Sequence, residues 1–303
     1  MERIMNFAAF VEKERVQDIL TGQSGAEVCE IGGNRMAKFI RREKLTERGL
    51  WEKYTHEAEF YRSVQGMKLP FVPKVLYADV RESEMLLVME KYNTIDRSEI
   101  SDALLDKVTA VLAGIHTLPV PGFIKQHEQK PLEYAEADIA SYVDGWESVL
   151  QEHENAFDRS ALHAIARDIN QINGRFHSKR ACFTHGDFHF ENLLQDGEGN
   201  ILVCDWQCCG CGDPSGDLSF LMSRLLSDGY PLDEEKLVAA YCRHANERGL
   251  DVCPDEVKAQ MALSNLNISF MYWHMYLHGA TKERVGDIYG KMLEDYRTLK
   301  NML

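Results

Sequence analysis

The sequence lacks an apolar run long enough to cross a membrane. Charged side chains interrupt its apolar stretches well before the roughly 18 residues that a membrane-spanning helix needs. The first residues, "MERIMNFAAFVEKER", place acidic side chains on both sides of a short apolar patch, which is unlike a secretory signal. We therefore expect a cytoplasmic protein with no membrane partner.

The sequence also lacks the regular cysteine spacing of a small disulfide-rich domain. Four of its eight cysteines lie close together at Cys204, Cys208, Cys209 and Cys211. A zinc site would need a matching pair of cysteines or histidines at a suitable distance, and no such pair is present. We expect free thiols in a reducing compartment, and we interpret the cluster as packing or incidental reactivity rather than metal binding.

Basic residues are scarce, because the chain has 34 Lys and Arg against 48 Asp and Glu, a net charge of −14. Residues 1–92 carry equal numbers of basic and acidic side chains, so the whole negative excess lies in residues 93–303. A nucleic-acid binder needs clustered basic side chains. The composition therefore argues against a nucleic-acid partner. It also indicates that residues 93–303 have a partner that tolerates negative charge or is attracted to it.

Hydrophobic patterns in residues 1–92 predict a small, mostly antiparallel sheet with one helix. We expect a first helix around residues 8–20, and then two short strands in residues 22–42, joined by a Gly-Gly-Asn turn. Apolar residues recur at helical spacing in "ERGLWEKYTHEAEFYRSVQ", and the segments "PKVLYAD" and "MLLVMEKY" follow as strands. These elements predict an N-terminal lobe that ends near Tyr92 and Asn93.

From Ser98 onward the pattern is helical with one interruption, and we find no internal repeat. The interruption is residues 183–207, "FTHGDFHFENLLQDGEGNILVCDWQ", where the turn "DGEGN" predicts a hairpin between the strands "NLLQ" and "ILVCDW". The fold class is therefore α+β, with a small sheet lobe in residues 1–92 and a large, mostly helical lobe in residues 93–303.

The polar residues of this hairpin could belong to a metal site or to a phosphoryl-transfer site. A binuclear phosphoesterase would need further ligand clusters downstream, including a Gly-Asn-His segment, which are missing after residue 192. In the kinase catalytic loop, an Asp and an Asn lie five residues apart, and a second Asp follows the next strand. Asp187, Asn192 and Asp205 have this spacing. The pattern favours phosphoryl transfer, with magnesium held by hard oxygen ligands.

A phosphoryl-transfer site also needs groups that hold a nucleotide. The backbone at Ser24 and Gly25 could approach phosphates, Lys38 lies in a predicted strand, and Glu57 lies in the following predicted helix, where it could pair with Lys38. Each feature alone is typical of ordinary turns and surfaces. Their joint occurrence with the catalytic loop is what carries weight.

The segments "THGDFHFENLL", "CDWQ" and "GDPSGDLSFL" resemble three consecutive motifs of the aminoglycoside phosphotransferase and choline kinase family, which are small-molecule kinases with a two-lobed protein-kinase-like fold. The segment "TGQSGAEVCEI" resembles the nucleotide loop of that family, although it lacks the commoner double glycine. The resemblance implies a nucleotide-binding N-lobe in residues 1–92 and a catalytic, substrate-binding C-lobe in residues 93–303.

The resemblance also implies a role for each matching residue. Asp187 would be the catalytic base, Asn192 and Asp205 the magnesium ligands, Lys38 the phosphate contact and Glu57 its ion-pair partner. The backbone of Met89 and Lys91 would meet the base of ATP or GTP. His185 and Asp217 would be structural.

The acceptor is not identified by these motifs. Residues 131–158 contain eight acidic side chains and no basic one, interleaved with Tyr134, Tyr142 and Trp146. In the family, the helices of this region shape the substrate cleft, so these groups could receive a cationic acceptor such as an aminoglycoside or an amino alcohol. We expect Asp138, Glu147 and Glu191 to contact it. A solvated acidic surface is the alternative interpretation.

We therefore predict an ATP- or GTP- and Mg²⁺-dependent kinase that phosphorylates a hydroxyl of a small molecule. The alternative is a catalytically idle protein of the same fold that binds a nucleotide or a partner protein. A protein kinase is disfavoured because no activation segment ends in an Ala-Pro-Glu-like anchor. The sequence leaves the nucleotide preference, the acceptor and the oligomeric state open.

Overall fold

The computed structural model describes residues 17–21, 26–45, 49–125, 130–153, 156–178 and 180–303. The helix expected around residues 8–20 lies partly outside them, and it is wrong where they overlap. Residues Gln17–Thr21 form strand β1, which pairs antiparallel with β2, Glu27–Ile31. Pairing with a sheet edge outweighs the local helical pattern there.

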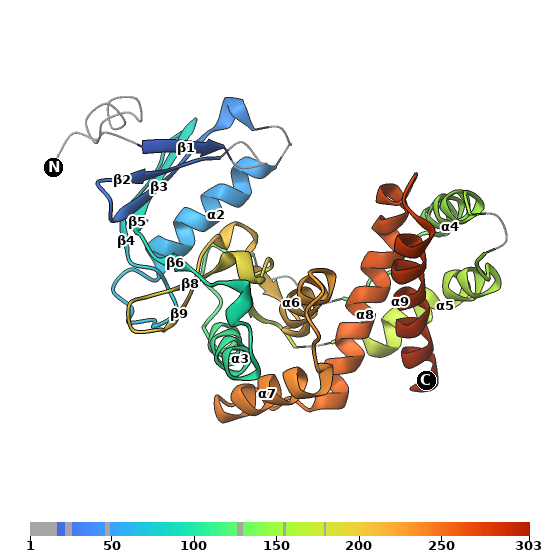
Figure 1. Cartoon of the computed structure of the whole chain (residues 1–303). Coiled ribbons are helices and arrows are strands. Elements are labelled where there is room, and N and C mark those ends of the chain that lie inside the picture. Colours follow the sequence, from blue (N-terminus) through green and yellow to red (C-terminus); the bar gives the residue numbers. More distant parts are fainter. Residues whose placement is uncertain (1–16, 22–25, 46–48, 126–129, 154–155, 179) are drawn as a thin grey trace. The chain divides into compact units, whose positions relative to one another are not determined.

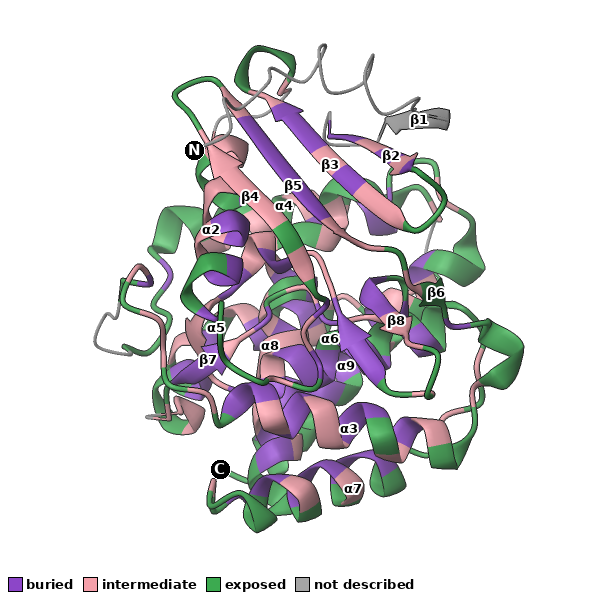
Figure 2. Cartoon of the chain, turned by 90° about the vertical axis from the view of Figure 1, so that its left-hand side faces the viewer, coloured by how far each residue is buried: buried purple, intermediate pink, exposed green. Residues whose placement is uncertain are grey.

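A five-stranded antiparallel sheet has the strand order β1-β2-β3-β5-β4 (Figure 1). Its other strands are β3 (Arg35–Arg41), β4 (Val75–Val80) and β5 (Glu84–Glu90). The predicted glycine turn joins β2 to β3, and Gly32 and Gly33 both have positive φ angles, which that tight hairpin requires. The central strands β3 and β5 are largely buried (Figure 2).

Helix α2, Leu50–Ser63, packs against this sheet along β4 and β5 and buries Tyr54, Ala58 and Tyr61, as its helical spacing predicts. Side chains alternate between the two faces of a strand. In β3, Ala37 and Phe39 pack in the apolar cluster of one face. Lys38 therefore projects from the opposite face.

The predicted hairpin is confirmed in residues 193–203. Its strands are β8 (Leu193–Gln195) and β9 (Ile201–Val203), and β6 (Asn93–Thr94) extends the sheet on the other side of β8. A second small sheet pairs β7 (Cys182–Thr184) with β10 (Gly210–Gly212). Short 3-10 turns precede and follow the hairpin: η3 (Phe190–Asn192) and η4 (Trp206–Cys208).

The rest of the described chain is mainly helical, and the helices predicted after Ser98 are confirmed. The α-helices are α3 (Asp102–His116), α4 (Glu136–Gln151), α5 (Ser160–Phe176), α6 (Ser215–Ser227), α7 (Glu234–Glu247), α8 (Pro254–Tyr272) and α9 (Lys282–Asn301). Three further 3-10 turns are η1 (Arg42–Lys44), η2 (Arg97–Glu99) and η5 (Trp273–Tyr276). The predicted α+β class, a small antiparallel sheet with a larger helical part, is confirmed.

The chain divides into two compact units. Unit 1 is residues 1–125 and 183–211, and unit 2 is residues 126–182 and 212–303. In unit 2, helices α4, α5, α8 and α9 share one apolar core that includes Trp146, Ile169, Phe270, Tyr289 and Leu299. The boundary predicted between residues 92 and 93 concerns lobes rather than these units and stays a prediction.

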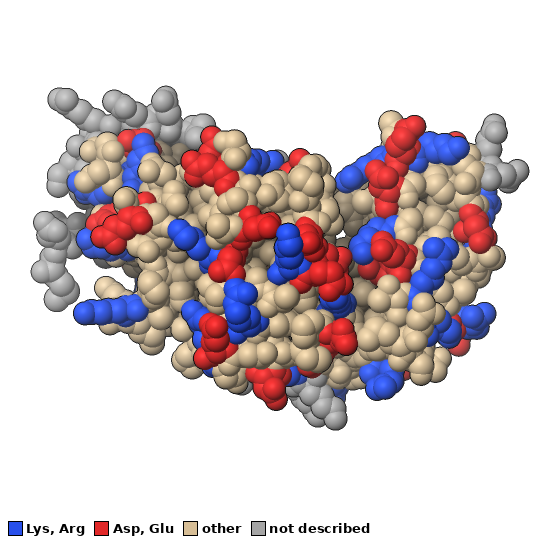
Figure 3. Space-filling view, turned by 60° about the horizontal axis from the view of Figure 1, so that its bottom comes forward, with Lys and Arg blue, Asp and Glu red and all other residues tan. Residues whose placement is uncertain are grey.

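Charged side chains of both signs are mixed over the face drawn in Figure 3, in small groups among other residues. Among the helices of the described residues, none combines the length and the apolar composition that a membrane crossing requires.

Candidate active site

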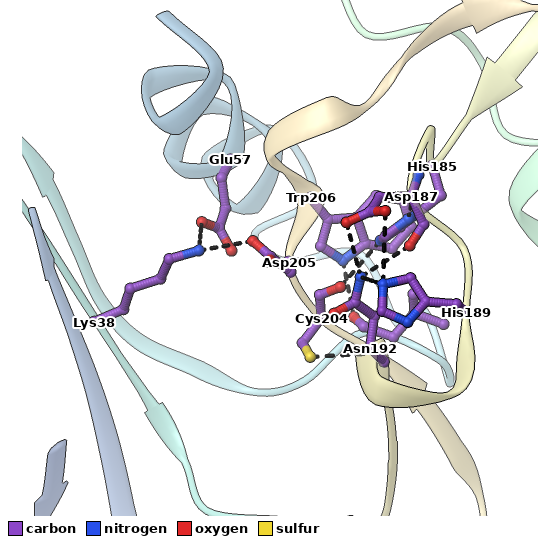
Figure 4. Close-up of polar contacts among 10 residues, drawn as sticks. Lys38, Glu57, His185, Asp187, His189, Asn192, Cys204, Asp205 and Trp206 are labelled. Carbon is purple, nitrogen blue, oxygen red and sulfur yellow. Dashed lines mark hydrogen bonds and ion pairs between the residues drawn. The ribbon is translucent and has the colours of Figure 1, made fainter. Parts of the chain in front are cut away.

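Lys38 joins two carboxylates at the centre of unit 1 (Figure 4). Its Nζ donates to Glu57 Oε2 at 2.8 Å and to Asp205 Oδ1 at 2.7 Å. Lys38 comes from the middle of β3, Glu57 from the buried face of α2, and Asp205 from the end of β9. Three segments far apart in the sequence therefore meet at one ammonium group.

The electrostatics of this group favour a charged lysine. Burial alone would lower the pKa of Lys38, but the negative charges of Glu57 and Asp205 outweigh it and raise that pKa. Glu57 is 1% exposed, whereas the side chain of Asp205 is 30% exposed. The buried Glu57 thus holds the Lys38 ammonium group in position, while Asp205 stays accessible to a ligand.

Asp205 has a left-handed backbone, with φ 62° and ψ 58°, which is uncommon for a residue other than glycine. This conformation ends β9 and starts η4. Backbone strain of this kind costs on the order of 1–3 kcal/mol and is found most often at functional sites.

Asp187 and Asn192 form the second part of the site. Asn192 Nδ2 donates to the Asp187 backbone carbonyl at 2.8 Å and to its Oδ2 at 3.2 Å, and His189 Nε2 lies 3.6 Å from Asp187 Oδ1 (Figure 4). Burial alone would raise the pKa of Asp187, but His189 and Asn192 outweigh it and lower that pKa. Asp187 is therefore an ionised carboxylate at neutral pH, able to accept a proton.

The loop that carries Asp187 is held from behind by His185, which is fully buried. His185 Nε2 donates to the Cys204 carbonyl at 3.0 Å, and its Nδ1 accepts the Asp187 backbone N–H at 3.3 Å. The next residue, Gly186, has φ 79°, and a Cβ there would lie 2.2 Å from the Cys208 carbonyl oxygen. Any larger residue would push the catalytic loop away from η4.

Asn192 and Asp205 are brought together by the hairpin. The Cys204 N–H donates to the Asn192 carbonyl at 3.0 Å. Within the described chain, no hydrogen bond involves Asn192 Oδ1 or Asp205 Oδ2. One carboxylate and one amide oxygen form a donor set that fits Mg²⁺, which takes few protein ligands and completes its shell with phosphate and water.

An aromatic stack ties α2 to the site. The Trp206 ring lies 3.9 Å from the Phe60 ring and 5.8 Å from the Phe183 ring between centroids, nearly parallel to both, and its Nε1 donates to the Val203 carbonyl at 2.8 Å. Sequence reasoning missed this role of Trp206, although its place beside Asp205 in "CDWQ" was a signal. The stack fixes the spacing between the helix of Glu57 and the turn after Asp205.

The residues predicted to contact the nucleotide are placed only in part. Ser24 and Gly25 lie outside the described residues. Met89 and Lys91 lie at the end of β5 and just beyond it. The Lys91 N–H donates to the Asn34 carbonyl at 2.9 Å, and its Nζ lies 2.5 Å from Glu30 Oε2. A nucleotide base would have to replace the first of these bonds to use that N–H.

The residues predicted to contact the acceptor differ in their partners. Glu191, in unit 1, lies 2.8 Å from Arg97 Nη2 and 3.0 Å from His189 Nδ1. Glu147, on α4 of unit 2, lies 3.0 Å from His163 Nε2.

Two further predicted residues belong to unit 2. Asp138 is exposed in the first turn of α4, and within the described residues no basic side chain pairs with it. Asp217 is 3% exposed in the first turn of α6, a burial that suits the predicted structural role.

The clustered cysteines are free thiols. Burial raises the pKa of Cys204 and of Cys209 to about 12, and it also raises the pKa of Cys208. These thiols are protonated at neutral pH and are poor metal ligands in that state. The residues that the structure describes contain no group of three or more His, Cys, Asp or Glu side chains placed to hold a metal ion.

Comparisons with known proteins identify the family of the chain. A family model described as "Phosphotransferase enzyme family" matches residues 23–255. No curated protein sequence matches the chain significantly.

Several solved structures share the fold. ADP-bound aminoglycoside phosphotransferase APH(2'')-Ib is 15% identical, with a TM-score of 0.59 over 95% of this chain and 96% of that one. A putative aminoglycoside phosphotransferase from Ralstonia eutropha is 16% identical, with a TM-score of 0.60 over 97% of both chains. Choline kinase LicA from Streptococcus pneumoniae is 17% identical, with a TM-score of 0.54 over 97% of this chain and 99% of that one. The predicted fold and family are confirmed.

Proposed function

Because the chain belongs to the phosphotransferase enzyme family, we propose that it transfers the γ-phosphoryl group of ATP or GTP, bound as the Mg²⁺ complex, to a hydroxyl of a small molecule. The observation that carries this proposal is the shared placement in unit 1 of an ionised Asp187 and the Lys38–Asp205 pair. The cytoplasm, where both nucleotides are abundant, is the location that we propose for it.

In this reaction the acceptor oxygen forms a bond to the γ-phosphorus. The bond between the γ-phosphorus and the β–γ bridging oxygen breaks, and the nucleoside diphosphate leaves. Asp187 accepts the hydroxyl proton as the new P–O bond forms. Lys38 would hold the phosphates, and Glu57 keeps the lysine charged and oriented. Asn192 and Asp205 would hold Mg²⁺, which neutralises phosphate charge when it is bound.

The ADP-bound relative supports a nucleotide as the phosphoryl donor. The other relatives are named for aminoglycosides and for choline, compounds that carry amino or quaternary ammonium groups, which supports a cationic acceptor. Within this chain, Glu147 and Glu191 already have partners, so Asp138 is the predicted contact whose charge remains for an ammonium group.

The test is an acceptor panel assayed with Mg²⁺ and either ATP or GTP, in which nucleoside diphosphate and phosphorylated product are both measured. The panel holds aminoglycosides, choline, amino sugars and sugar alcohols. Product formation that depends on both Mg²⁺ and the acceptor supports the proposal. If nucleotide binds but no acceptor is phosphorylated, while Asp187→Asn behaves like the parent in every assay, the idle-protein alternative holds.

A further inference from the structure

Unit 2 contains a cavity of about 470 Å³ between the start of α6 and helix α8. This volume is in the range of small-molecule sites in proteins. Its apolar wall consists of Leu132, Leu263, Ile268, Met271 and Tyr272. Leu132, Ile268 and Tyr272 are each nearly half exposed, so this wall is open to solvent within the described residues. An open apolar wall of this kind marks a place where ligands bind.

Four of the six polar side chains in the same wall, among the described residues, are already bonded to protein. Asp213, which carries the only charge among the described lining residues, accepts the Ser215 N–H at 2.9 Å and also the Ser215 hydroxyl. Asn267 accepts from the Tyr134 hydroxyl at 2.8 Å and donates to Asn173 Oδ1 at 2.9 Å, and Gln260 donates to the Phe176 carbonyl. A ligand rich in amines and hydroxyls would find few partners here.

A negative charge lies on the helix beside this wall. Tyr142 on α4 packs edge-on against Tyr134, with ring centroids 5.7 Å apart, and the Tyr134 hydroxyl donates to Asn267 of the wall at 2.8 Å. Asp138 and Tyr142 are one helical turn apart on α4. Asp138 is exposed and forms no ion pair with the described basic residues. An ammonium group beside Tyr142 and Tyr272 would be attracted to that carboxylate and to the aromatic faces.

We propose that this cavity binds the acceptor, and that the acceptor is an amphiphilic monocation with an apolar or aromatic body, one ammonium group and a hydroxyl. The apolar body lies against Leu263, Ile268 and Met271, and the ammonium group is directed toward Asp138. This proposal rests on the proposed function and sharpens its substrate class. It distinguishes the chain from an enzyme for polycationic sugars, whose amines need several free carboxylates.

Four probe compounds separate the two parts of the recognition. Phenylalaninol has the aromatic body, the ammonium group and the hydroxyl. 3-Phenyl-1-propanol lacks the ammonium group, ethanolamine lacks the aromatic body, and kanamycin is a polycation. Calorimetric titration of the full chain, without nucleotide, measures binding independently of turnover. We expect phenylalaninol to bind at least about tenfold more tightly than each of the other three, since burying a phenyl group and pairing the ammonium each contribute that much.

Two matched pairs of variants locate the site. Gly216 lines the cavity within α6, and a Cβ there would meet nothing within 4 Å, so Gly216→Leu fills the cavity without a backbone clash. Gly290, an exposed helical glycine of α9 with equally open surroundings, gives the control Gly290→Leu. Gly216→Leu should weaken phenylalaninol binding at least about tenfold, and Gly290→Leu should not.

Asp138→Asn tests the charged end, with Glu136→Gln as the control, because Glu136 is an exposed acid in the same helical turn on another face. Asp138→Asn should weaken binding of phenylalaninol but leave that of 3-phenyl-1-propanol unchanged. The exposed substitution Ile268→Asn checks the apolar wall without a risk to the core, and thermal unfolding verifies that each variant is folded.

The outcomes separate this inference from the proposed function. If phenylalaninol binds and responds to Gly216→Leu but is never phosphorylated, the cavity assignment stands and the proposed reaction loses support. If kanamycin is phosphorylated at a rate that Gly216→Leu leaves unchanged, the reaction stands and the cavity assignment is overturned. Equal binding of phenylalaninol and ethanolamine would also overturn it.

Discussion

Charged residues do different work in the two units. In unit 1, Lys38, Asp187 and Asp205 are partly exposed, and each lies within 4 Å of a side chain of opposite or complementary charge. In unit 2, the best-bonded carboxylate is Asp168, which is 5% exposed and joins two helices, while the open cavity is apolar. In unit 1 these charged side chains are therefore accessible to a ligand, whereas in unit 2 the charge of Asp168 links two helices.

This difference explains why related chains can share a reaction and differ in acceptor. Phosphoryl transfer requires fixed charges at fixed spacing, because developing charge on phosphate must be matched by the protein. Under the acceptor site proposed above, recognition of the acceptor would depend on the wall formed by α6 and α8, which belong to unit 2. The comparison makes a direct prediction: neutral isosteres of the charged site residues of unit 1 should remove activity but not stability, whereas neutral isosteres of the buried carboxylates Asp168 and Asp295 of unit 2 should change stability but not activity.

The largest effect is expected for Asp187→Asn. The amide cannot accept the acceptor proton, so turnover should fall by about two to four orders of magnitude, the usual contribution of a positioned general base. Nucleotide affinity and thermal stability should stay close to those of the parent. Steady-state kinetics, calorimetry and thermal unfolding measure the three quantities.

The control for this variant is Glu198→Gln, an exposed carboxylate at the tip of the same hairpin. It should behave like the parent in all three assays. Parental turnover in Asp187→Asn would remove Asp187 from the reaction and with it the contrast between the units.

A second large effect is expected for Asp205→Ala. Loss of the carboxylate removes a hard oxygen donor and leaves Lys38 paired with Glu57 alone, so affinity for the Mg²⁺ complex of ATP should fall at least about tenfold. Affinity for ATP without Mg²⁺ should change much less. Calorimetric titration with ATP in the presence and absence of Mg²⁺ measures the two affinities. An equal loss of both affinities would mean that Asp205 positions the phosphate-binding groups and does not bind the metal.

The proximity of the residues in these two predictions could be predicted from the sequence. Asp187 and Asn192 precede one hairpin and Asp205 follows it, so local sequence determines that they lie close together. The pairing of Lys38 with Glu57 could be predicted because each residue lies in an element, a strand or a helix, with a clear hydrophobic periodicity.

The rest could not be predicted, because it depends on packing between distant segments. Helical spacing around residues 17–20 was overruled by pairing with a strand. Trp146, expected among the acceptor contacts, is fully buried, and its Nε1 donates to the Phe270 carbonyl at 3.1 Å. The cavity of unit 2 is built from Leu132, Gly216 and Ile268. No local pattern connects these three positions.

The next effect concerns the stability of unit 2. Asp168 on α5 accepts from Arg167 Nε at 2.9 Å and, on α9, from the Tyr296 hydroxyl and Lys300 Nζ, both at 2.8 Å. Hydrogen bonds from Arg167 foremost, and then from Lys300 and Tyr296, lower the pKa of Asp168 despite its burial. Asp168→Asn should reduce the free energy of unfolding by about 2–3 kcal/mol at pH 7.

The pH dependence of that loss follows from the sign of the shift. A carboxyl whose pKa is lowered on folding adds stability above its unfolded pKa of about 3.9, and that stability disappears as the pH falls through the lower folded value. The difference in stability between the parent and Asp168→Asn should therefore be constant at neutral pH, begin to shrink below about pH 3.9 and keep shrinking as the pH falls further. Denaturant unfolding at several pH values measures this difference. The folded variant should keep the turnover of the parent, and a loss of turnover without a loss of stability would contradict the comparison.

The smallest effect is expected for Asp295 on α9, a carboxylate of unit 2 that burial opposes. Burial raises the pKa of Asp295 to about 6, although Lys291 Nζ lies 3.0 Å from its Oδ1 and acts in the other direction. Its Oδ2 is buried without a hydrogen bond among the described residues, and Glu294 and Glu234 add negative charge nearby. Asp168 and Asp295 are thus two different kinds of buried carboxylate. Asp168 accepts hydrogen bonds from three side chains, whereas Asp295 has one basic partner, Lys291.

A carboxyl with a raised pKa stabilises the fold below its unfolded pKa of about 3.9, and that contribution is lost as the pH rises through about 6. Asp295→Asn removes the ionisation, so it should raise the free energy of unfolding at pH 8 by about 1 kcal/mol, with part of the gain offset by the lost partner of Lys291. The gain should vanish near pH 4. Asp287→Asn, which changes an exposed aspartate of the same helix, is the control and should behave like the parent at both pH values. If Asp295→Asn destabilises the chain at pH 8, the ion pair with Lys291 outweighs the cost of burial, and Asp295 stabilises unit 2 as Asp168 does.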